Sequence, residues 1–300
     1  MLFSEYAEEW KRDARLNVSD GWKKTQDMML REHIIPYLGN KELTEIGHLC
    51  ISKTLSAGIS KGHAPNTVKQ TYLLLSKMFN DAVFFGHREK SPVVRRLHFP
   101  KAPKKERPYL LPDEAQKLIE YAKYHWSIQA IVIQIFLGLR AGEVIGLKWR
   151  SICFETSTLR VVEKWNRKTK TIDQYTKNKK DLVIPFSGKI RDFLLDLKKT
   201  MNPSDDDFVC AGPDGRTMMS YLSYQKAIIY LCKGAGIKRV SSHAFRHTCS
   251  TLWRRAGASN LDIQQLLNHE DEESTKTYIH DDFLRLRKIA DDVMNLSLAI

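Results

Sequence analysis

The sequence predicts a mainly helical protein of two domains, the second of which is mixed α/β, mostly helical, with a small antiparallel sheet. Apolar residues recur at helical spacing through most of the chain, which indicates helices that each bury one face. Between residues 91 and 112 this spacing is lost and five prolines appear, which is typical of an interdomain linker. Short apolar stretches at 158–162 and 182–185, bounded by turn residues, predict strands in the second half.

The composition is that of a globular protein with a polyanionic partner. Hydrophobic residues make up 42% and charged residues 28% of the 300-residue chain, which is typical of a soluble protein with an ample core. The net charge is +13, with 18 basic and 12 acidic side chains before residue 107 and 30 and 23 from there on. An excess in both halves favours a partner that touches both, such as a nucleic acid, over the alternative of a single basic tail.

Cysteine usage and hydropathy indicate a soluble protein of a reducing compartment. The five cysteines are scattered and include no CxxC pair, which indicates free thiols and not a disulfide framework or a zinc site. The first residues mix acidic and basic side chains, unlike a signal peptide, and the most apolar run, 128–139, is too short to span a bilayer. We therefore expect a cytoplasmic protein with no membrane partner.

Residues 1–90 are expected to form the helical first domain. The first helix has apolar side chains at helical spacing, at Phe3, Tyr6, Ala7 and Trp10. A second helix is expected from about residue 21 to Ile35, stopping at Pro36, and a third over 44–57. A long helix after Pro65 has an apolar stripe that predicts a core face, formed by Val68, Tyr72, Leu75, Met78, Phe79, Ala82 and Val83.

Residues 91–108 predict a basic, Pro-rich linker. Its basic side chains, opposed only by Glu106, are Arg95, Arg96, Lys101, Lys104, Lys105 and Arg107. This excess favours contact with phosphates, although a solvated tether is the alternative. Lys69 and Lys77 lie off the apolar stripe of the preceding helix, where they too could face DNA or simply be solvated.

The second domain is expected over residues 109–280, followed by a tail helix over 281–300. Pro112 and the two acids after it are typical of a first helical turn, and this helix should continue to about residue 123. The nearly all-apolar run 128–137 predicts a buried central helix. Gly138 ends that helix, which places Arg140 at the surface beside a short helix. Further helices are expected over 188–199 and 220–235.

A β-hairpin with a strong positive charge is expected between residues 158 and 185. Alternating residues near 158–162, a polar segment over 169–176 and the apolar run 182–185 predict its strands. Residues 164–180 carry seven basic side chains against one acid, the densest positive patch of the chain. The candidates for DNA contact within it are Lys168, Lys170, Lys179 and Lys180.

The stretch from His243 to His280 gathers two imidazoles, a guanidinium and a phenol in one helical region. His243 and Arg246 are three residues apart, so they share a face of one helix, which Ala256-Gly257 should end. His269 follows a second apolar-periodic run, and Tyr278 comes nine residues later. Arginine and histidine can hold the charge of a phosphate, and a phenol can attack its phosphorus.

These motifs resemble the tyrosine recombinases, the phage integrase family. HAFRHT at 243–248, LLNH at 266–269 and TYIH at 277–280 are similar to the family's second signature box, and GLRAGEVIGL at 138–147 to its first. The turn at 37–39 and the run 79–83 resemble the helical core-binding (SAM-like) domain of the same family. The resemblance implies that residues 1–90 bind core-type DNA sites and that residues 109–280 are catalytic.

The resemblance also implies roles for six residues. Tyr278 would be the nucleophile, and the two guanidinium groups that hold the phosphate would come from Arg140 and Arg246. His243 would act as general base or proton relay, and His269 would donate a hydrogen bond to the same phosphate. Lys177, eight residues before Pro185, matches the family's general acid. The family's S-x-R is missing after it, so Lys179 and Lys180 stay alternatives, and Asn268 replaces the family's glycine.

The implied function is site-specific DNA recombination for a mobile genetic element, encoded by a bacterium or phage. Such an enzyme cuts and rejoins strands through a 3′-phosphotyrosine, with no cofactor and no metal. The partners implied are double-stranded DNA, three further copies in a tetramer, and accessory DNA-bending or directionality proteins. The tail helix would dock on a neighbouring subunit or on its own domain. The alternatives are a type IB topoisomerase-like enzyme that relaxes DNA and a catalytically silent DNA-binding regulator.

Glu143 and His247 have other expected roles. Glu143, three residues after Arg140, is expected to orient that arginine or to cap local backbone. His243 and His247 are four residues apart and could share a metal ion on one helix face. The segment lacks the glutamate of H-E-x-x-H and places Arg246 between the two histidines, so a zinc site is not expected.

Overall fold

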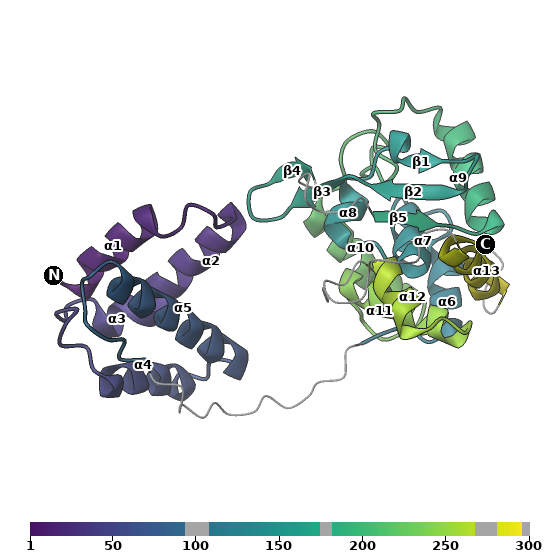
Figure 1. The fold of residues 1–300 in the computed structure, drawn as a ribbon. Helices are drawn as coiled ribbons and strands as arrows, with labels where there is room; N and C mark the ends of the chain where they lie inside the picture. Colours follow the sequence, from purple (N-terminus) through teal and green to yellow (C-terminus); the bar gives the residue numbers. More distant parts are fainter. Residues whose placement is uncertain (94–107, 175–181, 268–280, 296–300) are drawn as a thin grey trace. The chain divides into compact units, whose positions relative to one another are not determined.

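The computed structural model describes residues 1–93, 108–174, 182–267 and 281–295. The chain divides into two compact units, Met1–Lys105 and Glu106–Ile300, each with its own hydrophobic core (Figure 1). The structure is mainly helical with small antiparallel sheets in the second unit, as the hydrophobic periodicity predicts. Among the described segments, no helix combines the length and the apolarity needed to cross a bilayer.

The first unit is a helical bundle. Its helices are α1 (Phe3–Asp13), α2 (Asp20–Met29), the π-helical turn η1 (Leu30–Ile34), α3 (Ile35–Leu38), α4 (His48–Ser60) and α5 (Pro65–Phe84). The four apolar residues predicted for the first helix are all buried, and so is most of the stripe on α5, which confirms both core faces. The Tyr6 hydroxyl donates to the Met78 carbonyl at 2.6 Å and links α1 to α5.

Two helix boundaries in this unit differ from the prediction. We expected a stop at Pro36, but the chain stays helical to Leu38 with Pro36 in the first turn of α3. Within an α-helix, proline lacks an N–H for the helical hydrogen bond and its ring crowds the carbonyl four residues earlier. Here the wider π-helical turn Leu30–Ile34 directly precedes α3, so the helix continues through Pro36. The helix expected from residue 44 begins only at His48, where Gly47 is the N-cap.

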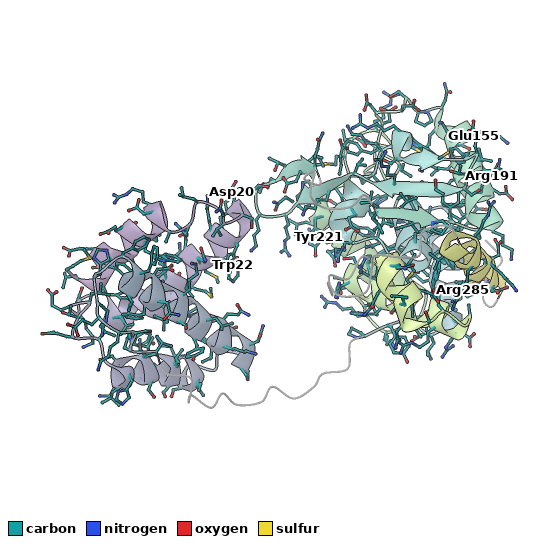
Figure 2. All side chains as sticks on the ribbon, viewed as in Figure 1. Asp20, Trp22, Glu155, Arg191, Tyr221 and Arg285 are labelled. Atoms are coloured by element: carbon teal, nitrogen blue, oxygen red, sulfur yellow. The ribbon has the colours of Figure 1, made fainter. Side chains whose placement is uncertain are left out.

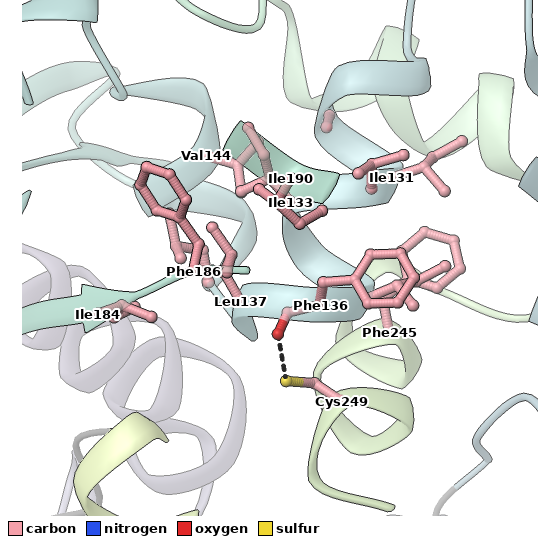
Figure 3. Close-up of a cluster of buried hydrophobic side chains, with 14 of the residues drawn as sticks. Ile131, Ile133, Phe136, Leu137, Val144, Ile184, Phe186, Ile190, Phe245 and Cys249 are labelled. Atoms are coloured by element: carbon pink, nitrogen blue, oxygen red, sulfur yellow. Dashed lines mark hydrogen bonds between the residues drawn. The ribbon is translucent and has the colours of Figure 1, made fainter. Parts of the chain in front are cut away.

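The helices of the second unit agree with the prediction to within a few residues. They are α6 (Pro112–Ala122), α7 (Ile128–Leu137), α8 (Ala141–Ile145), α9 (Gly188–Met201), α10 (Tyr221–Gly234), α11 (Ser242–Arg255), α12 (Asn260–Leu267) and α13 (Asp281–Asn295), with the 3-10 turn η2 at Trp149–Ser151. Helix α7 is the centre of the core and is buried on nearly all sides. Figure 3 shows its side chains between those of α8, β5, α9 and α11.

The expected small sheet is in fact two separate sheets. Strands β1 (Ile152–Cys153), β2 (Thr158–Val161) and β5 (Leu182–Pro185) form one, in the order β1-β2-β5. Strands β3 (Glu163–Asn166) and β4 (Thr171–Gln174) form the other, a two-stranded hairpin. Because β2 is already paired on both edges, β3 cannot pair with it although only Val162 separates the two strands.

Helix α13 packs on its own unit. Its buried side chains, which contact α11, β5 and α9, are Leu286, Ile289, Ala290, Val293 and Met294. On its exposed side, Arg285 pairs with Asp262 of α12 at 2.9 Å. The apolar face expected for the tail helix is therefore covered within the same chain in this structure.

Candidate active site

A glycine turn at the end of α7 starts the site. Gly138 has φ +66°, the left-handed conformation in which glycine ends a helix at least cost. A Cβ at this position would lie 2.5 Å from Leu267 Cδ2 and 3.1 Å from Cys249 Sγ. Glycine is therefore required both by the backbone angle and by the close approach of α11 and α12.

Arg140 follows this turn as the N-cap of α8, with its side chain 46% exposed. Glu143, whose side chain is 1% exposed, accepts the Arg140 backbone N–H at 2.7 Å and its guanidinium Nη1 at 3.0 Å. One buried carboxylate thus holds both the backbone and the side chain of the arginine. This confirms the prediction that Glu143 orients Arg140 and caps local backbone.

Glu143→Gln tests this arrangement. The amide keeps an oxygen for the Arg140 backbone N–H but loses the charge that holds the guanidinium, so we expect strand cleavage to slow about tenfold, the equivalent of roughly 1.4 kcal/mol. The measurement is the single-turnover cleavage rate of site DNA, with exposed Glu155→Gln (Glu155 is labelled in Figure 2) as the control. An unchanged rate in Glu143→Gln would show that the carboxylate charge is not needed to place Arg140.

Arg246 lies on α11, is 4% exposed and connects two helix ends. Its Nη1 donates to the carbonyl of Gly138 at 2.6 Å, and its Nη2 donates to the carbonyl of Leu267, the last residue of α12. The carbonyls at the carboxyl end of a helix carry partial negative charge, so a guanidinium between two such ends is stabilised. Arg246 therefore brings together α11, the turn before Arg140 and the residue two positions before His269.

Two further bonds fix α11 against the end of α7. Cys249 Sγ donates to the Phe136 carbonyl at 3.3 Å (Figure 3). Trp253 Nε1 donates to the same carbonyl at 3.2 Å. Burial raises the pKa of Cys249 to about 12, only partly opposed by the charge of Arg246, so the thiol keeps the proton that it donates. These contacts set the register at which Arg246 meets Gly138.

His243 is exposed in the first turn of α11, three residues before Arg246. Its ring meets that of His247 edge to face, with centroids 4.7 Å apart and an interplanar angle of 84°. Next to it, the Ser242 hydroxyl accepts from Gln225 Nε2 at 2.7 Å, which ties the start of α11 to α10. An exposed imidazole on a fixed helix end can exchange protons with a substrate in solution.

The β3–β4 hairpin lies against α8, the helix that Arg140 caps. A Cβ on Gly142 would lie 2.5 Å from the Trp165 carbonyl oxygen, and one on Gly146 3.2 Å from Lys164 Cα. Two glycines four residues apart therefore let the backbone of β3 touch the helix. The exposed hairpin turn carries Arg167 together with the predicted DNA-contact residues Lys168 and Lys170.

The structure thus brings Arg140, His243 and Arg246 into one region through Gly138 and Leu267. Lys69 and Lys77 are exposed on α5, and Lys77 pairs with Asp81 at 3.0 Å. Several predicted site residues lie outside the described residues: Arg95, Arg96, Lys101, Lys104, Lys105, Lys177, Lys179, Lys180, His269 and Tyr278. Arg167 and the carbonyl partners of Arg246 are not among the residues that the sequence motifs predicted. Arg167 could have been found as the third basic residue of the turn, whereas a carbonyl partner has no sequence signal.

Family comparisons match most of the chain. The sequence model of the Phage integrase family matches residues 108–285, and that of the Phage integrase N-terminal SAM-like domain matches residues 2–57. A tyrosine recombinase XerC-like protein of Caldanaerobacter subterraneus subsp. tengcongensis is 27% identical over 274 residues, which cover 80% of this chain and 69% of that protein. A tyrosine recombinase of Thermosipho africanus is 25% identical over 285 residues, 93% of either chain.

Solved structures share the fold. The Tn1549 transposon integrase in complex with transposon right end DNA has a TM-score of 0.77 at 20% identity, covering 95% of this chain and 98% of that one. The lambda integrase tetramer bound to a Holliday junction has a TM-score of 0.68 at 19% identity, covering 92% and 79%. At these identities the structures establish the fold of both units.

Proposed function

The chain belongs to the phage integrase family, and on this premise we propose that it is a site-specific DNA recombinase that cuts and rejoins strands through a 3′-phosphotyrosine. The observation that carries the proposal is the position of Arg246 between the carboxyl ends of α7 and α12. Through it, α11, which carries His243, is bonded to Gly138, two residues before Arg140, and to Leu267, two residues before His269 in the sequence. A guanidinium has five N–H donors in a planar fork, so it can hold backbone carbonyls and still contact a phosphate.

Each proposed residue supplies one part of a transesterification. The Tyr278 oxygen forms a bond to phosphorus while the bond from phosphorus to the 5′-oxygen breaks. Arg140 and Arg246 stabilise the charge that develops on the non-bridging oxygens, and His269 adds a hydrogen bond to the same phosphate. His243 takes up the phenol proton, and Lys177 gives a proton to the departing 5′-oxygen.

Rejoining reverses these steps. The 5′-hydroxyl of a partner strand attacks the phosphotyrosine, and the phenol leaves with a proton. The energy of the phosphodiester bond is retained in the covalent link, so neither a nucleotide nor a water molecule needs to enter the reaction.

We propose that the chain acts on double-stranded DNA as an oligomer. The relatives that support this are the Tn1549 integrase in complex with transposon right end DNA and the lambda integrase tetramer bound to a Holliday junction. Strand exchange between two sites needs one active site for each strand that is cut, which a tetramer supplies. The exposed basic turn of the β3–β4 hairpin is a surface suited to contact phosphates.

Covalent trapping tests this function. The protein is incubated in EDTA with pooled DNA from around its own gene, denatured with detergent, and analysed for protein-linked DNA, with Tyr278→Phe and Tyr124→Phe in parallel. We expect an adduct with wild type and with Tyr124→Phe but none with Tyr278→Phe, and sequencing the trapped DNA locates the site. An adduct with Tyr278→Phe would mean that another residue is the nucleophile.

The same experiment separates the alternative functions. Relaxed plasmid without recombinant product would indicate a topoisomerase-like enzyme. DNA binding without any adduct would indicate a regulator.

A further inference from the structure

The β3–β4 hairpin is a sheet of its own, so contacts outside the sheets must fix its position on the unit. One of these is the backbone contact of β3 with Gly142 and Gly146 of α8. A second is made by side chains on the strand face that looks toward α10. The Trp165 ring stacks on that of Tyr221, with centroids 6.0 Å apart and planes only 16° from parallel.

Arg167 adds a second contact to the Tyr221 ring. Its Cζ lies 4.8 Å from the centroid of the Tyr221 ring. Trp165 belongs to β3 and Arg167 is the first residue after that strand, so one short segment carries both contacts with Tyr221. Ring stacking and cation–ring contact both depend on orientation, so the two together restrict how the hairpin can tilt. Tyr221, labelled in Figure 2, is the first residue of α10 and so belongs to the rigid body of the unit.

The hairpin's orientation has a consequence for the reaction. Trp165 is paired with Ile172 of β4, and β4 ends at Gln174, three residues before Lys177. The same Trp165 places its carbonyl oxygen against Gly142, two residues after Arg140. The position of Trp165 on Tyr221 therefore sets where β4 ends, at Gln174, relative to the arginine that would hold the phosphate.

We propose that Trp165, Tyr221 and Arg167 are positioning residues for proton donation to the leaving 5′-oxygen. They touch no reacting atom themselves. The inference rests on the proposed function, in which the Lys177 proton passes to the 5′-oxygen as its bond to phosphorus breaks. If the stack is lost, the hairpin tilts and the proton donor is no longer held at the leaving group, while the nucleophile and the arginines keep their places.

A DNA site with sulfur in place of the bridging 5′-oxygen tests this directly. A thiolate is a far more stable anion than an alkoxide and leaves without a proton, so it does not need the acid. For the oxygen substrate we expect Tyr221→Ala to slow single-turnover cleavage about 10- to 100-fold, part of what a general acid contributes. For the sulfur substrate the rate should return to near that of wild type, and the same should hold for Lys177→Ala.

Matched variants separate positioning from folding and charge. Tyr221→Phe keeps the aromatic ring and should cleave the oxygen substrate at near the wild-type rate. Tyr124→Ala removes another tyrosine of this unit, which lies under the Lys123 ammonium as Tyr221 lies under Arg167 but is 93% exposed, and should leave both rates unchanged. Arg167→Ala changes only an exposed turn residue and should show a smaller loss with the same sulfur rescue. Lys168→Ala removes the neighbouring charge and should affect both substrates equally.

Several results would overturn the proposal. Equal losses on the two substrates in both Tyr221→Ala and Arg167→Ala would mean that the stack only supports the fold. In the double variant Lys177→Ala/Tyr221→Ala, a loss of cleavage rate equal to the product of the two single losses would mean that the stack acts independently of the acid. If the sulfur substrate restores the cleavage rate of Lys177→Ala but not that of Tyr221→Ala or Arg167→Ala, the positioning role is refuted and the proposed function remains. If wild type cleaves neither substrate, the proposed function itself is refuted, and this inference with it.

Discussion

Arg246→Ala is expected to slow strand cleavage by roughly 10³-fold, because the guanidinium would stabilise the charge of the transition state directly. The same change should lower the free energy of unfolding by about 2–4 kcal/mol, since the carbonyls of Gly138 and Leu267 lose a buried donor. The measurements are single-turnover cleavage of site DNA and urea denaturation of the full chain. Few other single changes should affect both rate and stability to this extent.

The controls separate charge, geometry and general surface effects. Arg246→Lys keeps the positive charge, but one ammonium cannot reproduce the planar fork that reaches two carbonyls, so much of the loss should remain. Arg255→Ala removes an exposed arginine from the same helix and should change neither quantity appreciably. A wild-type cleavage rate in Arg246→Ala would remove this residue from the proposed chemistry, whatever its effect on stability.

Gly138→Ala is expected to destabilise the protein by about 2–4 kcal/mol. Roughly 1 kcal/mol or more comes from placing a Cβ in the left-handed conformation, and about 1–3 kcal/mol from overpacking against Leu267 and Cys249. Leu267 is buried and its carbonyl is bonded to Arg246, so it cannot simply move away. Because Arg140 is only two residues further on, cleavage should fall as well. Urea denaturation and the cleavage assay measure the two effects.

Gly215→Ala is the matched control for this change. Gly215 also has a positive φ, +71°, but nothing lies within 4 Å of the position that a Cβ would take. Its substitution should therefore lower the free energy of unfolding only by the contribution of the left-handed backbone conformation, and cleavage should be unaffected. If Gly138→Ala were no worse than Gly215→Ala, the close contact between the end of α7 and α12 would not matter for stability.

The fold could be predicted from the sequence to a large extent. The predicted helix 128–137 coincides with α7, because a run of ten residues that is apolar except for Gln129 and Gln134 is best buried at the centre of a core. The helical spacing of Phe3, Tyr6 and Trp10 likewise determined a buried face, and all three are buried. The roles of Arg140, His243 and Arg246 came from motif resemblance and stay predictions; the structure adds that Arg140 caps α8 and that the other two residues lie on α11.

Other features were decided only by the tertiary structure. Arg246 is bonded to carbonyls 108 and 21 residues away along the chain, and a backbone carbonyl is present at every position, so no sequence pattern marks such a partner. The pairing of β2 on both edges with β1 and β5, which leaves no edge of β2 for the adjacent β3, involves a strand, β5, that follows β3 and β4 in the sequence. The stack of Trp165 on Tyr221 joins residues that no local spacing relates. Hydrophobic periodicity reports which face of a segment is buried, whereas the partner that buries it depends on how the whole chain packs.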